Sequence, residues 1–204
     1  MKLSGLGVED AHVESEERVW SGFLKLCRYK VRHALFQGGW SKTLVREAVL
    51  RVPSVGVLLY DPFLEKVVLV EQFRIGPLMS HDDPWLLEIV AGISEPGESL
   101  ESVAIREVKE EAGCEVKHLL PVSNFYVSPG ATNERFMLYC GIVDASSAGG
   151  VYGLPEEGED IRVHVLAEEE AWQMVEDGRI SNAPAIVALQ WLRLNHGELK
   201  DYVQ

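Results

Sequence analysis

The chain has 204 residues, of which 47% are hydrophobic and 25% charged, and its formal net charge at pH 7 is −13. This hydrophobic content is enough for a buried core, and no apolar run reaches the length of a membrane span. The negative charge argues against DNA or RNA as a partner, because nucleic-acid binding needs a positive surface. The acidic N-terminus lacks the pattern of a signal peptide, so we expect a cytoplasmic protein.

The first part of the chain, residues 1–51, predicts a small antiparallel β-meander. Residues 1–15 are polar and are expected to be loose at the start, and a stretch with period-two alternation in places begins at Glu17. A Gly38-Gly39 turn separates two such runs. A meander of this size buries little surface alone, so we expect it to pack on the main domain or on a second subunit.

Pro53 marks the entry into the main domain, which we place at residues 52–204. Two apolar strands are expected at 55–60 and 66–72, joined by an Asp61-Pro62 turn. A turn-rich loop and a further strand follow. In that strand Trp85, Leu87 and Ile89 share one face and Glu88 lies opposite them.

The stretch from Gly92 to Cys114 predicts a helix over about residues 99–112. Ser99 is a good N-cap, and Gly113 suits a left-handed C-terminal residue. Small and apolar side chains recur every four residues along this helix and predict a line that faces the core. A further apolar residue lies beside this line. These residues are Ala104, Val108 and Ala112, with Ile105 beside them.

Three acidic residues of this helix crowd one edge, because Glu107, Glu110 and Glu111 lie three and four positions apart. Like charges this close destabilise a helix and raise one another's pKa. We therefore expect a positive group among them. A hard divalent cation such as Mg²⁺ suits oxygen ligands of this kind.

The last third of the chain supplies more strand, a second acidic site and two helices. A Ser128-Pro129-Gly130 turn interrupts the strand material. An acidic loop at 156–160 precedes an alternating strand that begins at Ile161, and helices are expected at 167–176 and 183–194. The six histidines lack metal-ligand spacing, and the odd number of cysteines predicts reduced thiols in packed positions.

The pattern of the Gly92–Cys114 stretch resembles the Nudix box at every fixed position. Those positions are Gly92, Glu98, Arg106, Glu107, Glu110, Glu111 and Gly113. The resemblance implies a loop, helix and loop that bind Mg²⁺ or Mn²⁺ and hydrolyse the pyrophosphate of a nucleoside diphosphate derivative. It also agrees with the α/β/α sandwich with a mixed sheet, of the α/β (α+β) class, that the order of elements suggests.

The resemblance implies roles for individual residues around the metal. The expected metal-binding residues are Ala91, through its carbonyl, with Glu107, Glu110, Glu111 and Glu159. Glu157 is expected to act as general base. Glu110 could instead orient a ligand, and Glu156 and Asp160 are interpreted as solvated acids of the loop.

Within the family, the chain is most similar to ADP-ribose pyrophosphatases. A Gln-x-Arg after the second strand implies that Arg74 binds the substrate phosphates, and Pro129, fifteen residues beyond Cys114, is typical of this subgroup. The subgroup forms homodimers with exchanged N-terminal sheets. The exchange implies that Phe23 and Arg46 sandwich the adenine. Separately, the loop with Pro129 is expected to shape the pocket for the terminal ribose, with Ser128 and Glu134 as further ligand contacts.

Several alternatives stay open at this point. Phe23 could be a core residue and Arg46 a surface cation, and Glu88 could be a structural partner of an arginine such as Arg106. The substrate could be a nucleotide sugar or a dinucleotide in place of ADP-ribose. The remaining rival is a nonhydrolytic regulator that binds ADP-ribose, although such a binder has no need for the full set of carboxylates.

Overall fold

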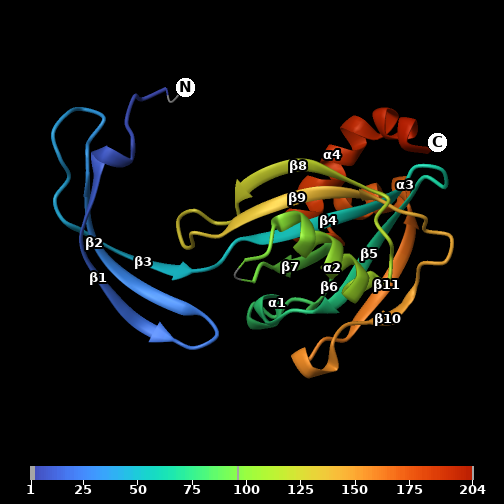
Figure 1. Ribbon diagram of the computed structural model, residues 1–204. Coiled ribbons are helices and arrows are strands. Elements are labelled where there is room, and N and C mark those ends of the chain that lie inside the picture. The colour runs from blue at the N-terminus through green and yellow to red at the C-terminus, as the bar shows by residue number, and fades with distance from the viewer. Residues whose placement is uncertain (1–2, 96, 204) are drawn as a thin grey trace. The chain divides into compact units, whose positions relative to one another are not determined.

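The computed structural model describes residues 3–95 and 97–203, except for the side chains of Glu157 and Val203 (Figure 1). The described chain divides into two compact units. The first contains the N-terminal residues up to Val52 together with Tyr126–Glu134, and the second contains Pro53–Phe125 and the residues from Arg135 onward. No described helix is long and apolar enough to span a lipid bilayer.

The first unit is built on a three-stranded antiparallel sheet with the order β1-β2-β3, which confirms the predicted small antiparallel sheet. Strand β1 begins at Ala11, directly after the 3-10 helix η1, and thus before Glu17, where the sequence pattern first indicated a strand. Every residue of β1 is exposed within the single chain. The strands of this sheet and the preceding 3-10 helix are η1 Val8–Asp10, β1 Ala11–Ser21, β2 Lys25–His33 and β3 Leu44–Leu50.

The second unit is organised around a mixed sheet with the strand order β10-β11-β5-β4-β9-β8. Strands β4 and β9 run parallel, whereas β4 pairs antiparallel with β5 and β7. Strand β6, which is not part of this strand order, pairs antiparallel with β5. The strands are β4 Ser54–Asp61, β5 Lys66–Phe73, β6 Trp85–Glu88, β7 Val90–Ile93, β8 His118–Tyr126, β9 Arg135–Ile142, β10 Gly150–Tyr152 and β11 Ile161–Ala167.

Alternation along the central strands separates two hydrophobic layers. Val57 of β4 and Val70 of β5 pack in one buried cluster with Val108 of helix α2. Leu58 and Tyr60 of β4 belong to a second cluster, which helices α3 and α4 complete on the opposite face (Figure 1). This arrangement is the α/β/α sandwich with a mixed sheet that the sequence predicted.

The helical elements differ from the predictions in three places. A short helix, α1, occupies part of the segment that was expected to be a loop. Helix α4 passes through His196 and Gly197, where an end was expected. Ile105 of α2 is exposed, although it was expected beside the core-facing line. The helices are α1 Ile75–Met79, α2 Leu100–Ala112, α3 Glu168–Glu176 and α4 Ala183–Leu199, with the 3-10 helices η2 Pro155–Glu157 and η3 Lys200–Val203.

Candidate active site

Helix α2 is fixed at both ends by the residues that the sequence indicated. The Ser99 side chain accepts a hydrogen bond from the backbone N–H of Ser102 at 3.2 Å, and Gly113 ends the helix with φ 64°. Val103 and Val108 are fully buried against the sheet. The helix therefore holds its acidic edge at a fixed place above the sheet.

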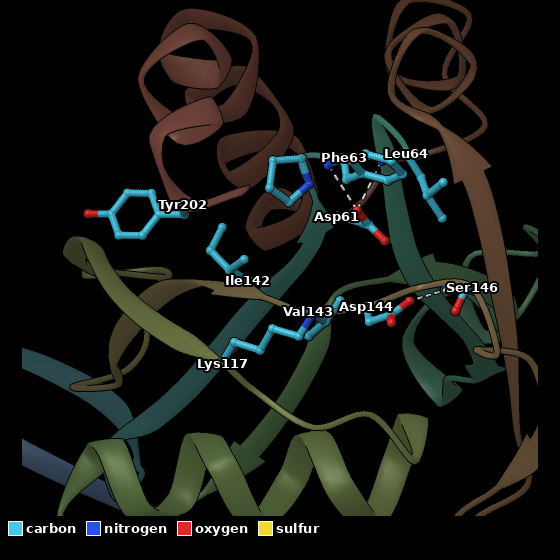
Figure 2. Close-up of a pocket in the computed structure, with 10 residues that line it drawn as sticks. Asp61, Phe63, Leu64, Lys117, Ile142, Val143, Asp144, Ser146 and Tyr202 are labelled. Atoms are coloured by element: carbon cyan, nitrogen blue, oxygen red, sulfur yellow. Dashed lines mark hydrogen bonds between the residues drawn. The ribbon is translucent and has the colours of Figure 1, made fainter. Parts of the chain in front are cut away.

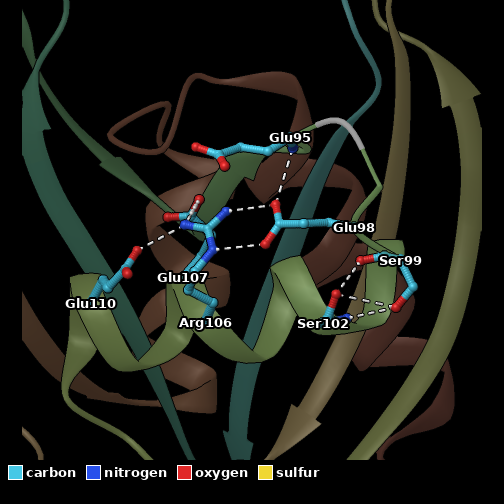
Figure 3. A network of polar contacts seen from close by, with 7 residues as sticks. All are labelled: Glu95, Glu98, Ser99, Ser102, Arg106, Glu107 and Glu110. Carbon is cyan, nitrogen blue, oxygen red and sulfur yellow. Dashed lines mark hydrogen bonds and ion pairs between the residues drawn. The ribbon is translucent and has the colours of Figure 1, made fainter.

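Arg106 supplies part of the positive charge that the acidic edge requires (Figure 3). Its Nη1 donates to Oε1 of Glu107 and to Oε2 of Glu110, each at 2.9 Å. Its Nε and Nη2 lie 3.3 Å from the two carboxylate oxygens of Glu98. Glu98 in turn accepts from the backbone N–H of Glu95 at 3.0 Å, so one arginine joins the helix to the loop before it.

Glu111 is a buried carboxylate, with 2% of its surface exposed. It accepts a hydrogen bond from the backbone N–H of Ala91 on β7 at 3.0 Å. Burial raises the pKa of Glu111 to about 8, and the negative charges of Glu107 and Glu159 act in the same direction. Burial also raises the pKa of Glu107 to about 7, although Arg106 opposes the shift.

The acidic loop contributes Glu159 to this region. The charge of Glu159 raises the pKa of both Glu107 and Glu111, so the loop brings this carboxylate close to helix α2. Its Oε2 accepts from the backbone N–H of Leu154 at 3.0 Å. The side chain of Glu157, the expected base, lies outside the described part of the chain.

The chemistry of these carboxylates fits a hard divalent cation. Glu107, Glu111 and Glu159 offer only oxygen donors, and their mutual repulsion is relieved most directly by a positive ion between them. Among the described residues, no group of three His, Cys, Asp or Glu side chains converges closely enough to hold an ion. Each of the three carboxylates instead accepts from an internal donor, Arg106, the Ala91 N–H or the Leu154 N–H.

Arg74 lies at the end of β5 beside the same site. Its guanidinium binds Glu88 of β6, with Nη2 to Oε2 at 2.8 Å and Nε to Oε2 at 2.9 Å. Its charge also lowers the pKa of Glu111. Glu88 thus has an arginine partner, but that partner is Arg74 and not the suggested Arg106, whose guanidinium binds other carboxylates.

The remaining predicted substrate contacts lie in the first compact unit. Phe23 is exposed in the single chain, and Arg46 donates to the Val45 carbonyl at 2.8 Å. Sequence reasoning missed Arg51, whose guanidinium lies 5.8 Å from the Phe23 ring centroid and 3.8 Å from Glu134. The remaining predicted residues of this unit, Ser128 and Pro129, belong to its segment Tyr126–Glu134.

A cavity of about 320 Å³ lies elsewhere in the second unit, at the turn between β4 and β5 (Figure 2). Asp61, which lines it, accepts from the backbone N–H groups of Phe63 and Leu64 at 2.9 and 3.0 Å. Its other oxygen accepts from the Ala145 N–H at 2.8 Å. Asp61 therefore serves the turn, and the carboxylates of α2 do not line this cavity.

Comparison with known proteins identifies a family and relatives that match most of this chain. The NUDIX domain model matches residues 50–196. The ADP-ribose pyrophosphatase of Escherichia coli (strain K12) is 47% identical over 195 residues, which cover 96% of this chain and 93% of the relative. The ADP-ribose pyrophosphatase of Haemophilus influenzae is 44% identical, with coverage of 94% and 90%.

A solved structure supports the fold independently. It is described as an ADP compounds hydrolase and superposes with a TM-score of 0.73, covering 96% of this chain and 99% of its own. Its sequence identity is 16%, so this likeness concerns the fold alone. The family model and the relatives, taken with the complete motif in residues 92–114, lead to one conclusion. The chain belongs to the NUDIX domain family.

Proposed function

We propose that this protein hydrolyses the pyrophosphate bond of ADP-ribose and releases AMP and ribose 5-phosphate. The observation that carries the proposal is the pair of neighbouring carboxylates on helix α2, partly buried Glu107 and buried Glu111, within a stretch that meets every fixed position of the Nudix motif. The substrate is proposed from the ADP-ribose pyrophosphatases that are 44–47% identical over nearly the whole chain.

Members of this family act with divalent metal ions, and we propose Mg²⁺ here, with Mn²⁺ as a substitute. Glu107, Glu111 and Glu159 would hold it together with the Ala91 carbonyl, and Glu110 would either join them or orient a ligand. When bound, the ion neutralises the diphosphate and lowers the pKa of a water molecule. The net charge of −13 makes such neutralisation necessary for an anionic substrate.

The chain's own residues then have distinct tasks. Glu157 accepts a proton from the water molecule as that molecule attacks one phosphorus of the diphosphate. The bond from this phosphorus to the bridging oxygen breaks, and the bridging oxygen leaves with the other phosphate. Arg74 donates to phosphate oxygens and stabilises the negative charge that develops on them. Arg106 holds Glu107 and Glu110 in place through its two 2.9 Å hydrogen bonds.

We further propose a homodimer in which the N-terminal sheets are exchanged. The complete exposure of β1 in the single chain supports this proposal, because a three-stranded sheet with so little burial needs a partner surface. Phe23 of the partner subunit and Arg46 of the partner subunit would sandwich the adenine. Ser128, Pro129 and Glu134 would shape the pocket for the terminal ribose.

The proposed activity is tested by product analysis. The purified protein is incubated with ADP-ribose, a nucleotide sugar or a dinucleotide, each with and without Mg²⁺. We expect equal amounts of AMP and ribose 5-phosphate from ADP-ribose only when the metal is present. Faster cleavage of another diphosphate would change the proposed substrate, and tight binding of ADP-ribose without products would identify a regulator.

A further inference from the structure

Gln72 of β5 carries a buried hydrogen-bond donor that finds no acceptor among the residues that the structure describes. Only 7% of the residue is exposed, and within the described residues its Nε2 has no hydrogen-bond partner. Buried polar groups are nearly always paired. A donor that loses its hydrogen bond to water on burial costs free energy unless an acceptor in the protein or in a ligand replaces the water. The amide of Gln72 therefore requires an explanation.

Strand alternation shows which face of the sheet Gln72 occupies. Val68 and Val70 pack in the cluster that contains Val108 of helix α2, whereas Leu69 packs in the cluster on the opposite face. Side chains two residues apart on a strand share a face. Gln72 therefore continues the row of Val68 and Val70 on the side that helix α2 covers.

The same face brings Gln72 close to the charged groups of the active site. Strand pairing sets Gln72 opposite Leu86 and Val70 opposite Glu88, so Glu88 is a diagonal neighbour of Gln72. Arg74 stands two residues farther along the chain and binds Glu88 at 2.8 Å. Along the chain, Gln72 thus lies between Val70, which is in the apolar core, and Arg74.

We propose that Gln72 is a substrate-binding residue whose Nε2 donates to a diphosphate oxygen of the bound substrate, beside Arg74. This inference rests on the proposed function, since the ligand is the diphosphate that Arg74 would bind. The nearby carboxylates already accept from Arg74 or from the Ala91 N–H, and Glu88, the partner of Arg74, is the diagonal neighbour of Gln72. An oxygen-rich anion that enters at Arg74 supplies the missing acceptor.

The substitution Gln72→Met tests the contact, because methionine keeps the length of the side chain and removes both polar atoms. We expect kcat/KM for ADP-ribose with Mg²⁺ to fall about 10- to 100-fold, the usual effect of losing a hydrogen bond to a charged group. The thermal unfolding temperature of the substrate-free protein should stay the same or rise, because an unpaired buried donor has been removed. Gln173→Met, on the exposed surface of α3, is the matched control and should leave kcat/KM unchanged.

Two results would overturn the proposal. One is a Gln72→Met enzyme whose kcat/KM stays within twofold of wild type, and the other is a clear fall in its unfolding temperature, which would make the amide structural. Kinetics are compared on whichever diphosphate the wild-type enzyme cleaves. Failure of the wild type to release AMP from ADP-ribose would refute the proposed substrate, whereas unchanged kinetics of Gln72→Met would refute only this contact.

Discussion

Glu111 has a carboxylate that is almost completely buried. Burying its negative charge costs free energy unless a cation lies close to it. We predict that Glu111→Gln leaves the fold intact, since an amide oxygen can still accept from the Ala91 N–H. Turnover should fall about 10³-fold, because a ligand charge is lost where the reaction needs it. Measured kcat with circular dichroism checks this, and Glu156→Gln on the exposed loop is the control. Near-normal turnover would show that the Nudix motif takes no part in the mechanism.

The raised pKa values of Glu107 and Glu111 predict a pH effect on the metal-free protein. The two values are about 7 and about 8, well above the ordinary value of 4.5. The folded protein therefore binds these two protons more tightly than the unfolded chain does. Their contribution to the unfolding free energy is complete below the ordinary pKa of 4.5, and it is lost as pH rises through 7–8. Between pH 6 and 9 the unfolding free energy should fall by on the order of a few kcal/mol.

Urea denaturation in the presence of EDTA measures this effect across the same pH range. The Glu111→Gln protein is the comparison, because it has lost the group with the higher pKa and should show a shallower decline. Parallel curves for the two proteins would contradict the assigned burial effect.

At the scale of single residues, sequence reasoning was most reliable where the contact is local. The spacing of Glu107 and Glu111 on one helix dictates that they are neighbours, whatever the rest of the fold. Partners across strands depend on register, so Glu88 could be linked to an arginine but not to Arg74 in particular. The orphan amide of Gln72 had no sequence signal at all, because burial is a property of the assembled sheet.

At the scale of elements, β7 and helix α2 approach each other at Gly92. A Cβ atom on Gly92 would overlap the carboxyl group of Glu107. We predict that Gly92→Ala displaces Glu107, lowers turnover by tenfold or more, and costs about 1–3 kcal/mol of unfolding free energy. Kinetics and chemical denaturation measure both effects.

A glycine in open space provides the control for this substitution. Apart from its chain neighbours and the backbone of its own helix, no described atom lies within 4 Å of a Cβ added to Gly197 in helix α4. Gly197→Ala should therefore keep full activity and raise the unfolding free energy by up to about 1 kcal/mol, since alanine favours the helix. Full activity in Gly92→Ala would contradict the prediction. It would show that β7 can shift to make room for the methyl group and that Glu107 does not depend on the close contact with Gly92.

The element boundaries show where local signals compete with packing. The ends of α2 were predictable because Ser99 and Gly113 act on the adjoining backbone. Helix α4 continues past Gly197 because Leu199, beyond the glycine, is buried in the core cluster, and that burial offsets the cost of glycine within a helix. The sequence around Gly197 does not show that Leu199 is buried against other elements, so it could not predict where the helix ends.

At the scale of the whole molecule, the fold class followed from hydrophobic periodicity, since strands and helices must bury their apolar faces in layers. The strand order did not follow from it. The parallel pairing of β4 with β9 joins segments about eighty residues apart, and only the assembled core selects that partner.

The N-terminal sheet leads to a prediction about assembly. Val13, Val19 and Trp20 of β1 are exposed in the single chain, and apolar side chains of this size on one strand favour association. We predict a homodimer in solution, with twice the mass of one chain by sedimentation equilibrium. Its unfolding temperature should rise with protein concentration, because association stabilises only the folded chains.

A variant that separates the subunits tests whether the partner completes the site. Val13→Asp combined with Trp20→Asp places charges on the exposed strand and should yield a monomer that still folds, because neither residue is buried in the single chain. If Phe23 of the partner subunit stacks on the adenine, KM for ADP-ribose should rise about 10- to 100-fold, the usual effect of losing an aromatic contact with a base. The turnover number should change much less, because the carboxylates of α2 belong to the other compact unit. A monomeric variant with the KM of wild type would show that each subunit binds its substrate alone.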